Sequence, residues 1–283
     1  MISLLYIDYN TFINLMINRI PVASGSFYEA DKDKLRYHLK ELFDKAPDSS
    51  IAKTIGLLVP HAGYLYSGQV AAYGYKRLTK KPGTVFLLGP NHSGIGSPIS
   101  IFPQSIWQTP LGEVKTNNSI IEKLSADHLI TVDENAHRYE HSLEVQLPFL
   151  QYLFDSNFSI VPLSLKDQSL STCIQLGKLI ASVWCVSDVI IASTDLTHYE
   201  NQKSANSKDH LALEAIKKMD TGLLSETIAA NNISMCGPGA AIAVIEAARQ
   251  LRANKAEILN YATSGEVTGD YSSVVGYAAV AIE

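Results

Sequence analysis

The chain has 283 residues, of which 46% are hydrophobic and 18% charged, and its net charge is −5. These values are typical of one large folded domain or two small ones, and they exclude an intrinsically disordered chain. Lysine and arginine are scattered singly or in pairs, without the basic stripe that binds nucleic acid. We therefore expect no nucleic-acid partner.

The first 18 residues, MISLLYIDYNTFINLMIN, are apolar but lack the basic region and cleavage site of a signal peptide. Asp8 and several asparagines interrupt the apolar run, which is too short to span a membrane. We predict an N-terminal extension, 1–18, packed on a domain formed by 19–283, with a peripheral anchor as the alternative. No other stretch predicts a membrane span.

Short runs rich in branched residues, bounded by Gly, Pro, Ser or Thr, predict buried strands at 54–60, 84–90, 158–165, 189–194, 258–265 and 273–283. Amphipathic segments predict helices at 31–46, 67–80, 142–154, 170–184, 210–219 and 239–251. Pro148 should either kink the third helix or set its start. The alternation predicts a single α/β domain whose mostly parallel central sheet is flanked by helices.

Histidines follow three of the predicted strands. His61 follows the first strand, Asn91 and His92 follow the second, and Asp195 and His198 follow the fourth. Because ligands bind beyond the carboxyl ends of strands in open α/β sheets, we expect the three histidines at one edge of the sheet. A single such histidine is typical of an ordinary loop, whereas three in the same topological position favour a shared site.

The three cysteines differ in their surroundings. Cys236 precedes Gly237-Pro238-Gly239 and a predicted helix, where the helix dipole should lower the pKa of a thiol. We interpret it as reactive or metal-ligating, with a small residue packing a turn as the alternative. Cys173 and Cys185 lie in an apolar helical run and should be in the core. The odd, sparse cysteine count indicates a reducing compartment, hence the cytoplasm, and the lack of a CxxC pair excludes a structural zinc ribbon.

Two imidazoles and one anion suit a metal ion with open coordination positions. Two histidines and a carboxylate are the pattern of oxygen-activating iron sites, and a thiolate instead of the carboxylate favours copper, zinc or a modified iron site. Asp195 and His198, three residues apart, suit a general acid/base pair close enough to meet in a turn.

The segment HRYEHSLEVQLPF offers a second histidine pair. His137 and His141 are four residues apart and would share a face if a helix formed there, a spacing that can chelate a metal ion. Glu140 and Glu144 make an ordinary charged first turn an equal alternative. We place His141 at the edge of the pocket and Tyr66 beside His61, with core packing as the alternative for Tyr66.

The segments VPHAGYLYSG, GPNHSG, EHSLEVQLPFL, STDLTHYE and CGPGA occur in this order. Together they resemble the Memo family, whose prokaryotic members are called AmmeMemoRadiSam system protein B, and the resemblance runs from about residue 20 to the end. The family is similar in fold to the class III extradiol dioxygenases. Those enzymes hold a non-haem iron ion with two histidines and a glutamate.

This resemblance implies that His61, His92 and Cys236 bind the metal ion, with Cys236 at the place of the dioxygenase glutamate. Asp195 and His198 match the remaining polar pair and are expected to be catalytic. We assign substrate binding to His141, Tyr66 and Asn91.

The implied cofactor is one divalent or redox-active metal ion, iron or copper before zinc. The resemblance implies an oxidoreductase with redox or oxygen chemistry on an unknown substrate, with a small molecule or a peptide as ligand, and a functional link to a radical SAM protein. The alternative is a non-enzymatic protein that binds a metal ion or a peptide.

Overall fold

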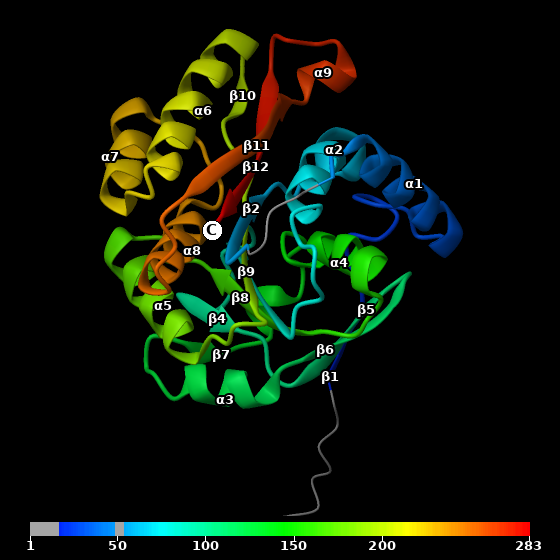
Figure 1. Ribbon diagram of the computed structural model, residues 1–283, viewed down its shortest axis with the longest axis vertical. Helices are drawn as coiled ribbons and strands as arrows, with labels where there is room; N and C mark the ends of the chain where they lie inside the picture. Colours follow the sequence, from blue (N-terminus) through cyan, green and yellow to red (C-terminus); the bar gives the residue numbers. More distant parts are fainter. Residues whose placement is uncertain (1–16, 49–53) are drawn as a thin grey trace, which may run out of the picture.

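The computed structural model describes residues 17–48 and 54–283. They form an α/β fold in which helices cover both faces of a mixed, mostly parallel sheet (Figure 1). This confirms the predicted fold class at that level of detail. Residues 1–16, most of the predicted extension, lie outside the described residues, and the predicted boundary at 18/19 stays a prediction.

Four parallel strands form the centre of the sheet. In spatial order they are β8 (Ser159–Leu165), β3 (Thr84–Pro90), β9 (Val189–Ser193) and β2 (Gly56–Val59). Helices cover both faces, so these strands are apolar along nearly their whole length and do not alternate with polar residues. All four confirm strands predicted from the sequence. Their parallel direction places every carboxyl end at the same edge.

Strands of both directions extend the sheet beyond this centre. Next to β8 follow β6 (Gly112–Thr116), β5 (Ser105–Thr109) and β1 (Ile17–Arg19), with β4 (Ile99–Ile101) and β7 (Thr131–Val132) beside them. Next to β2 lies β12 (Val274–Ile282), which is antiparallel to β2, β10 (His198–Glu200) and β11 (Ala256–Thr263). The last two predicted strands are therefore present as an antiparallel pair.

The helices form two layers, each with its own apolar core. One face of the sheet carries α1 (Lys32–Lys45), α2 (Tyr64–Tyr75) and α4 (Leu147–Phe154). The other carries α3 (Asn118–Ser125), α5 (Leu170–Val183), α6 (Gln202–Lys217), α7 (Thr221–Asn231) and α8 (Pro238–Gln250) (Figure 1). A short α9 (Gly265–Thr268) joins β11 to β12. The sheet is thus buried on both sides.

The segment around Pro148 differs from the predicted helix 142–154. The α-helix begins only at Leu147, with Pro148 in its first turn, so the proline sets the start of the helix instead of kinking it. His137 ends a separate 3₁₀ turn, Asn135–His137. His137 and His141 therefore do not share a helix face, and the condition for a chelating pair at this spacing is not met.

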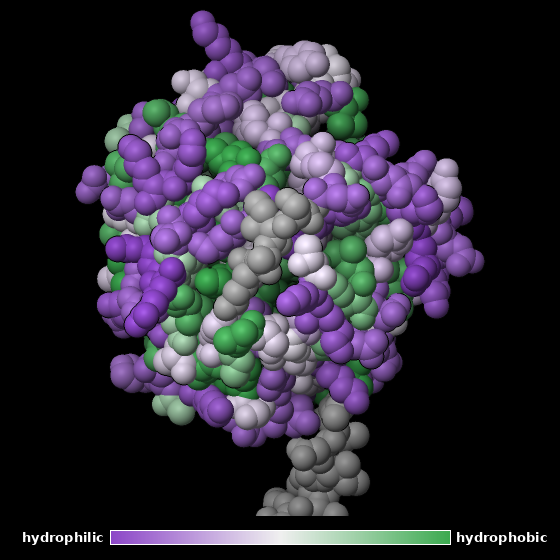
Figure 2. Space-filling view, in the orientation of Figure 1, coloured by the Kyte–Doolittle hydropathy of each residue, from purple (hydrophilic) through white to green (hydrophobic). Residues whose placement is uncertain are grey.

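Among the described residues, no helix is long and apolar enough to cross a membrane. The face shown in Figure 2 mixes hydrophilic and hydrophobic residues, and its hydrophobic residues form several separate patches.

Candidate metal centre

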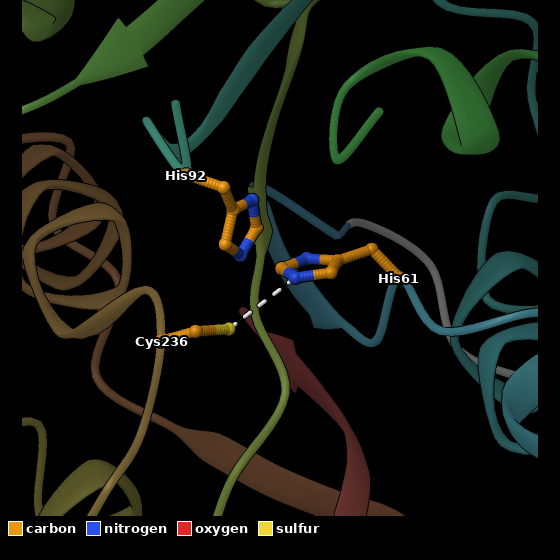
Figure 3. Close-up of side chains that lie close together, drawn as sticks. All are labelled: His61, His92 and Cys236. Atoms are coloured by element: carbon orange, nitrogen blue, oxygen red, sulfur yellow. Dashed lines mark hydrogen bonds between the residues drawn. The ribbon is translucent and has the colours of Figure 1, made fainter. Parts of the chain in front are cut away.

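His61, His92 and Cys236 converge at the carboxyl edge of the sheet. His61 follows β2, His92 follows β3, and Cys236 precedes α8. One nitrogen of each imidazole and the sulfur atom all lie within 4.8 Å of one another. The three side chains point toward a common space (Figure 3). Two nitrogens and a thiol at this separation can hold a metal ion.

His61 is the most enclosed member, with 2% of its surface exposed. Its Nδ1 lies 3.0 Å from the Ser193 hydroxyl, and its Nε2 lies 3.3 Å from the Cys236 sulfur. Burial, with the nearby charge of His92, lowers the pKa of His61 to about 3. The imidazole is therefore neutral at physiological pH, as metal ligation requires.

His92 is more open, with 37% of its side chain exposed, and a buried carboxylate holds it from behind. Glu140 accepts hydrogen bonds from the Nδ1 of His92 at 2.9 Å and from its backbone nitrogen at 2.7 Å. This leaves Nε2 as the nitrogen that faces His61 and Cys236 (Figure 3). Partial burial lowers the pKa of His92, but the hydrogen bond to Glu140 outweighs it and the net shift is upward.

Glu140 remains ionised in this position. Burial alone would raise its pKa, but the hydrogen bond and charge of His92, together with the amides of Ser142 and His92, lower it to about 2. His92, Glu140 and His141 form a second group with ligand atoms within 4.8 Å. Both Glu140 oxygens already accept N–H donors, from His92 and from the Ser142 amide. We therefore interpret Glu140 as a support for His92 and not as a ligand.

The loop that carries Glu140 is anchored by the N-terminal strand. Arg19 of β1 donates to the Glu140 carbonyl at 2.6 Å and pairs with the buried Glu144 carboxylate at 2.6 Å. Glu144 also accepts from the backbone nitrogens of Val22 and Ala23. A buried ion pair with these additional hydrogen bonds fixes the loop, because a lone buried charge would be strongly unfavourable.

Cys236 contradicts the prediction of a low thiol pKa. The first amides of α8 are satisfied elsewhere: Gly237 donates to Thr194 Oγ1 and Gly239 to Gln168 Oε1. A Cβ on Gly237 would lie 2.8 Å from the Ser193 carbonyl, so only glycine lets this turn pack against the end of β9. Burial, with the charge of Asp195, raises the pKa of the Cys236 thiol in the metal-free protein.

The other two cysteines differ from each other. Cys173 is buried in α5 as predicted, and burial raises its pKa to about 12. Cys185 was predicted to be in the core, but it follows the end of α5 and is exposed. The α-helix ends at Val183, two residues before Cys185, so Cys185 is not held against the core by the helix.

Asp195 and His198 lie beside the cluster but have different hydrogen-bond partners. Asp195 is buried, and its Oδ1 accepts from the His61 backbone nitrogen at 2.8 Å. The Nδ1 of His198 lies 2.9 Å from the Ser234 carbonyl. Burial raises the pKa of Asp195, while the hydrogen bond from His61 acts in the opposite direction. The direct contact expected within this pair is replaced by separate contacts to His61 and Ser234.

The three residues assigned to substrate binding occupy different positions. His141 belongs to the cluster: its ring centre lies 4.8 Å from His92 and 5.5 Å from His61, and burial lowers its pKa to about 4. Tyr66 is 40% exposed in the first turn of α2. The Asn91 side chain shapes its own loop, because it accepts from Gly94 N and donates to the Ile95 carbonyl.

Comparisons with known proteins agree with this architecture. The model of the Memo-like protein family matches residues 19–281. A MEMO1 family protein of Methanosarcina barkeri is 43% identical over 268 residues, covering 94% of this chain and 100% of that protein. One from Methanocaldococcus jannaschii is 43% identical over 284 residues, covering 94% and 99%. The crystal structure of an uncharacterized Escherichia coli K12 protein shares the fold, with a TM-score of 0.52 at 12% identity, covering 80% of this chain and 99% of that one.

Proposed function

Because the chain belongs to the Memo-like protein family, we propose that it is a metal-binding protein whose centre is formed by His61, His92 and Cys236. The observation that supports this proposal most is the convergence of two imidazole nitrogens and a thiol within 4.8 Å. The Nδ1 atoms of both histidines already form hydrogen bonds with protein groups, so their Nε2 atoms are the ones available to bind a metal ion.

The donor set suits iron or copper, with zinc as a further candidate. Imidazole is a ligand for all three metals, and a thiolate favours softer ions than the carboxylate of a typical oxygen-activating iron site does. Deprotonation of a buried thiol is unfavourable without a cation, so metal binding would also release the Cys236 proton.

We further propose redox or oxygen chemistry on a small molecule, in a fold of the class III extradiol dioxygenase type. A redox-active ion would supply electron transfer or oxygen activation at this place. His198 would move a proton through Nε2, because its Nδ1 faces the Ser234 carbonyl. Asp195 would hold the His61 backbone, while His141 and Tyr66 would contact substrate at the open side.

Family membership also supports proposals beyond the centre itself. Residues 19–283 would be the family domain, preceded by the extension 1–18. The protein would act in the cytoplasm and be functionally linked to a radical SAM protein.

A second candidate function is metal or peptide binding without turnover. The enclosure of His61 favours it, because a buried ligand leaves less room for a substrate to reach the ion. Oxygen consumption by the metal-loaded protein, measured against the metal-free protein with candidate aromatic and thiol substrates, separates the two functions.

Metal titration under argon tests the ligand assignment. We expect His61→Ala to abolish tight binding of copper(I) or iron(II), because it removes one of three protein ligands. His198→Ala should keep nearly the whole affinity, since His198 is assigned to proton transfer. An equal loss in both variants would make His198 a ligand and contradict the assignment.

A further inference from the structure

We propose that Ser193 and Gln146 are positioning residues of the metal centre, which keep the proton of His61 on Nδ1 and leave the Nε2 lone pair facing the metal position. The inference rests on the proposed metal-binding function for its purpose, although the hydrogen-bond geometry exists without metal. Ser193 contacts His61 at Nδ1, and Gln146 contacts Ser193. Neither residue contacts Nε2, the nitrogen that faces the metal position, so both act through His61.

The direction of each hydrogen bond follows from the groups that can only accept. Gln146 Nε2 lies 3.0 Å from the Pro60 carbonyl, which identifies that atom as the amide nitrogen, and it also donates to Ser193 Oγ at 2.7 Å. Ser193 Oγ lies 2.6 Å from the Ser142 carbonyl, so the single hydroxyl proton of Ser193 is used there.

This arrangement determines the tautomer of His61. With its proton donated to Ser142 and one lone pair occupied by Gln146, Ser193 Oγ can only accept from His61 Nδ1 at 3.0 Å. Nδ1 therefore carries the hydrogen and Nε2 carries the lone pair. The opposite tautomer would place two acceptors face to face at Ser193 and an N–H where the metal ion should bind.

Bulk solvent does not reach these groups. Ser193 and Gln146 are fully buried, and so is Tyr75, which donates to the Gln146 side-chain oxygen at 2.8 Å. The strand register adds a mechanical restraint, because Ser193 pairs with Val59, two residues before His61. Hydrogen bonds thus connect Ser193 at the end of β9, Pro60 after β2 and Gln146 before α4 on the Nδ1 side of the His61 ring.

The functional consequence is a ligand that is already oriented before metal arrives. Loss of the outer partner of a metal-ligating histidine typically weakens metal binding by 10–100-fold. We expect about tenfold weaker binding in Ser193→Ala, because the hydroxyl is a neutral partner. Gln146→Met should act in the same direction and by less, since it loosens Ser193 without removing its oxygen.

The first readout uses the metal-free protein. Ring ¹⁵N–¹H correlation spectra of histidine-labelled protein report which nitrogen carries the proton. We expect His61 as the Nδ1–H form in the wild type and in Ser193→Thr, which keeps the hydroxyl. Ser193→Ala should populate the Nε2–H form. Ser164→Ala is the matched control, because Ser164 is equally buried on β8, a central strand of the same sheet, and its hydroxyl has no partner among the described residues.

Gln146→Met is added to these four proteins for both readouts, and the second readout is the copper(I) or iron(II) affinity of all five. Reduced affinity in Ser193→Ala, restored in Ser193→Thr and unchanged in Ser164→Ala, supports the positioning role. A wild-type tautomer in both Ser193→Ala and Gln146→Met overturns it. If the wild type binds neither metal, the proposed metal-binding function is wrong. The tautomer spectra still test, separately, whether Ser193 and Gln146 keep the proton of His61 on Nδ1.

Discussion

His61 and His92 leave parallel strands at the same edge of the sheet, yet the protein supports them differently. A buried chain of neutral groups, Ser193 and Gln146, holds His61, whose side chain is almost inaccessible. An ionised carboxylate, Glu140, holds His92, whose side chain is partly open. The difference shows that two imidazoles of one cluster can be oriented by unlike groups.

The unlike supports also distribute charge unequally. On the His92 side, Glu140 contributes a fixed negative charge directly behind the ring. On the His61 side the group behind the ring, Ser193, is neutral. The acidic groups there are Asp195, which lies 3.9 Å from His61 Nε2, and the Cys236 thiol, which would become a thiolate once a cation is bound. The two sides should therefore respond differently to mutation, to thiol reagents and to pH.

Removal of the Glu140 charge should have the largest effect. In Glu140→Gln, one side-chain oxygen remains where two oxygens now accept from three N–H groups. The new amide nitrogen is itself a donor and would face one of those N–H groups. We expect metal affinity to fall by about 10–100-fold and the free energy of unfolding to fall by roughly 1–3 kcal/mol. Metal titration and urea unfolding measure both quantities.

Glu134→Gln, at an exposed glutamate of the same loop, is the matched control and should change neither quantity. The comparison predicts that Glu140→Gln weakens metal binding more than Ser193→Ala does. The reverse order would show that the neutral relay is the stronger support.

Thiol labelling should test how enclosed the His61 side is. We expect the exposed Cys185 to react with an alkylating reagent at pH 7 at least about tenfold faster than Cys236, because burial raises the pKa of Cys236 and limits access to it. Cys173 should react slowest. Added metal should protect Cys236 alone, which mass-spectrometric mapping can show. Faster labelling of Cys236 than of Cys185 would mean that the His61 side opens in solution.

The smallest expected effect is an opposite response of the two histidines to pH. The pKa of His61 is about 3, below its unfolded value of 6.5, and the pKa of His92 is raised above that value. In metal-free protein, histidine ring signals should show His92 titrating above pH 6.5 and His61 remaining neutral down to about pH 4.

The signs for stability follow from these pKa values. The contribution of neutral His61 to the free energy of unfolding is fully present above pH 6.5. It is lost as pH falls toward 3, by about 1.4 kcal/mol per pH unit at most. His92 contributes fully below pH 6.5, and its contribution is lost as pH rises through its folded pKa. Titration of both rings at the same pH would contradict the comparison.

Sequence patterns predicted the buried centre of the fold better than its edges. The strands 84–90 and 189–194 were found almost to the residue, because strands covered on both faces are continuous apolar runs. The hairpin β5–β6 was missed, since SIWQT and GEVKT are short and half polar. Helix α6 begins at Gln202, eight residues before the prediction, because its first two turns are largely polar.

At the site, the strand-end positions of His61 and His92 predicted their convergence, since parallel strands end at one edge. The supports were not predicted. Ser193 has the pattern of a strand end, and Gln146 lies within a predicted helix. A polar glutamine within the apolar stretch VQLPF was the only hint in the sequence that Gln146 has a buried polar partner. The prediction of a lowered pKa for Cys236 was wrong, because burial, which the sequence does not show, raises the pKa more than the helix terminus lowers it.

The distance along the chain between the members of the centre also bears on how the protein is made. His61 and Cys236 are 175 residues apart, and β2, which precedes His61, lies between β9 and the last strand, β12. During synthesis from the N-terminus the histidines emerge long before the thiol, so the complete set of proposed ligands is present only when the C-terminal part of the chain has been translated. A metal ion that needs all three ligands would therefore select finished molecules and, by mass action, stabilise them against unfolding.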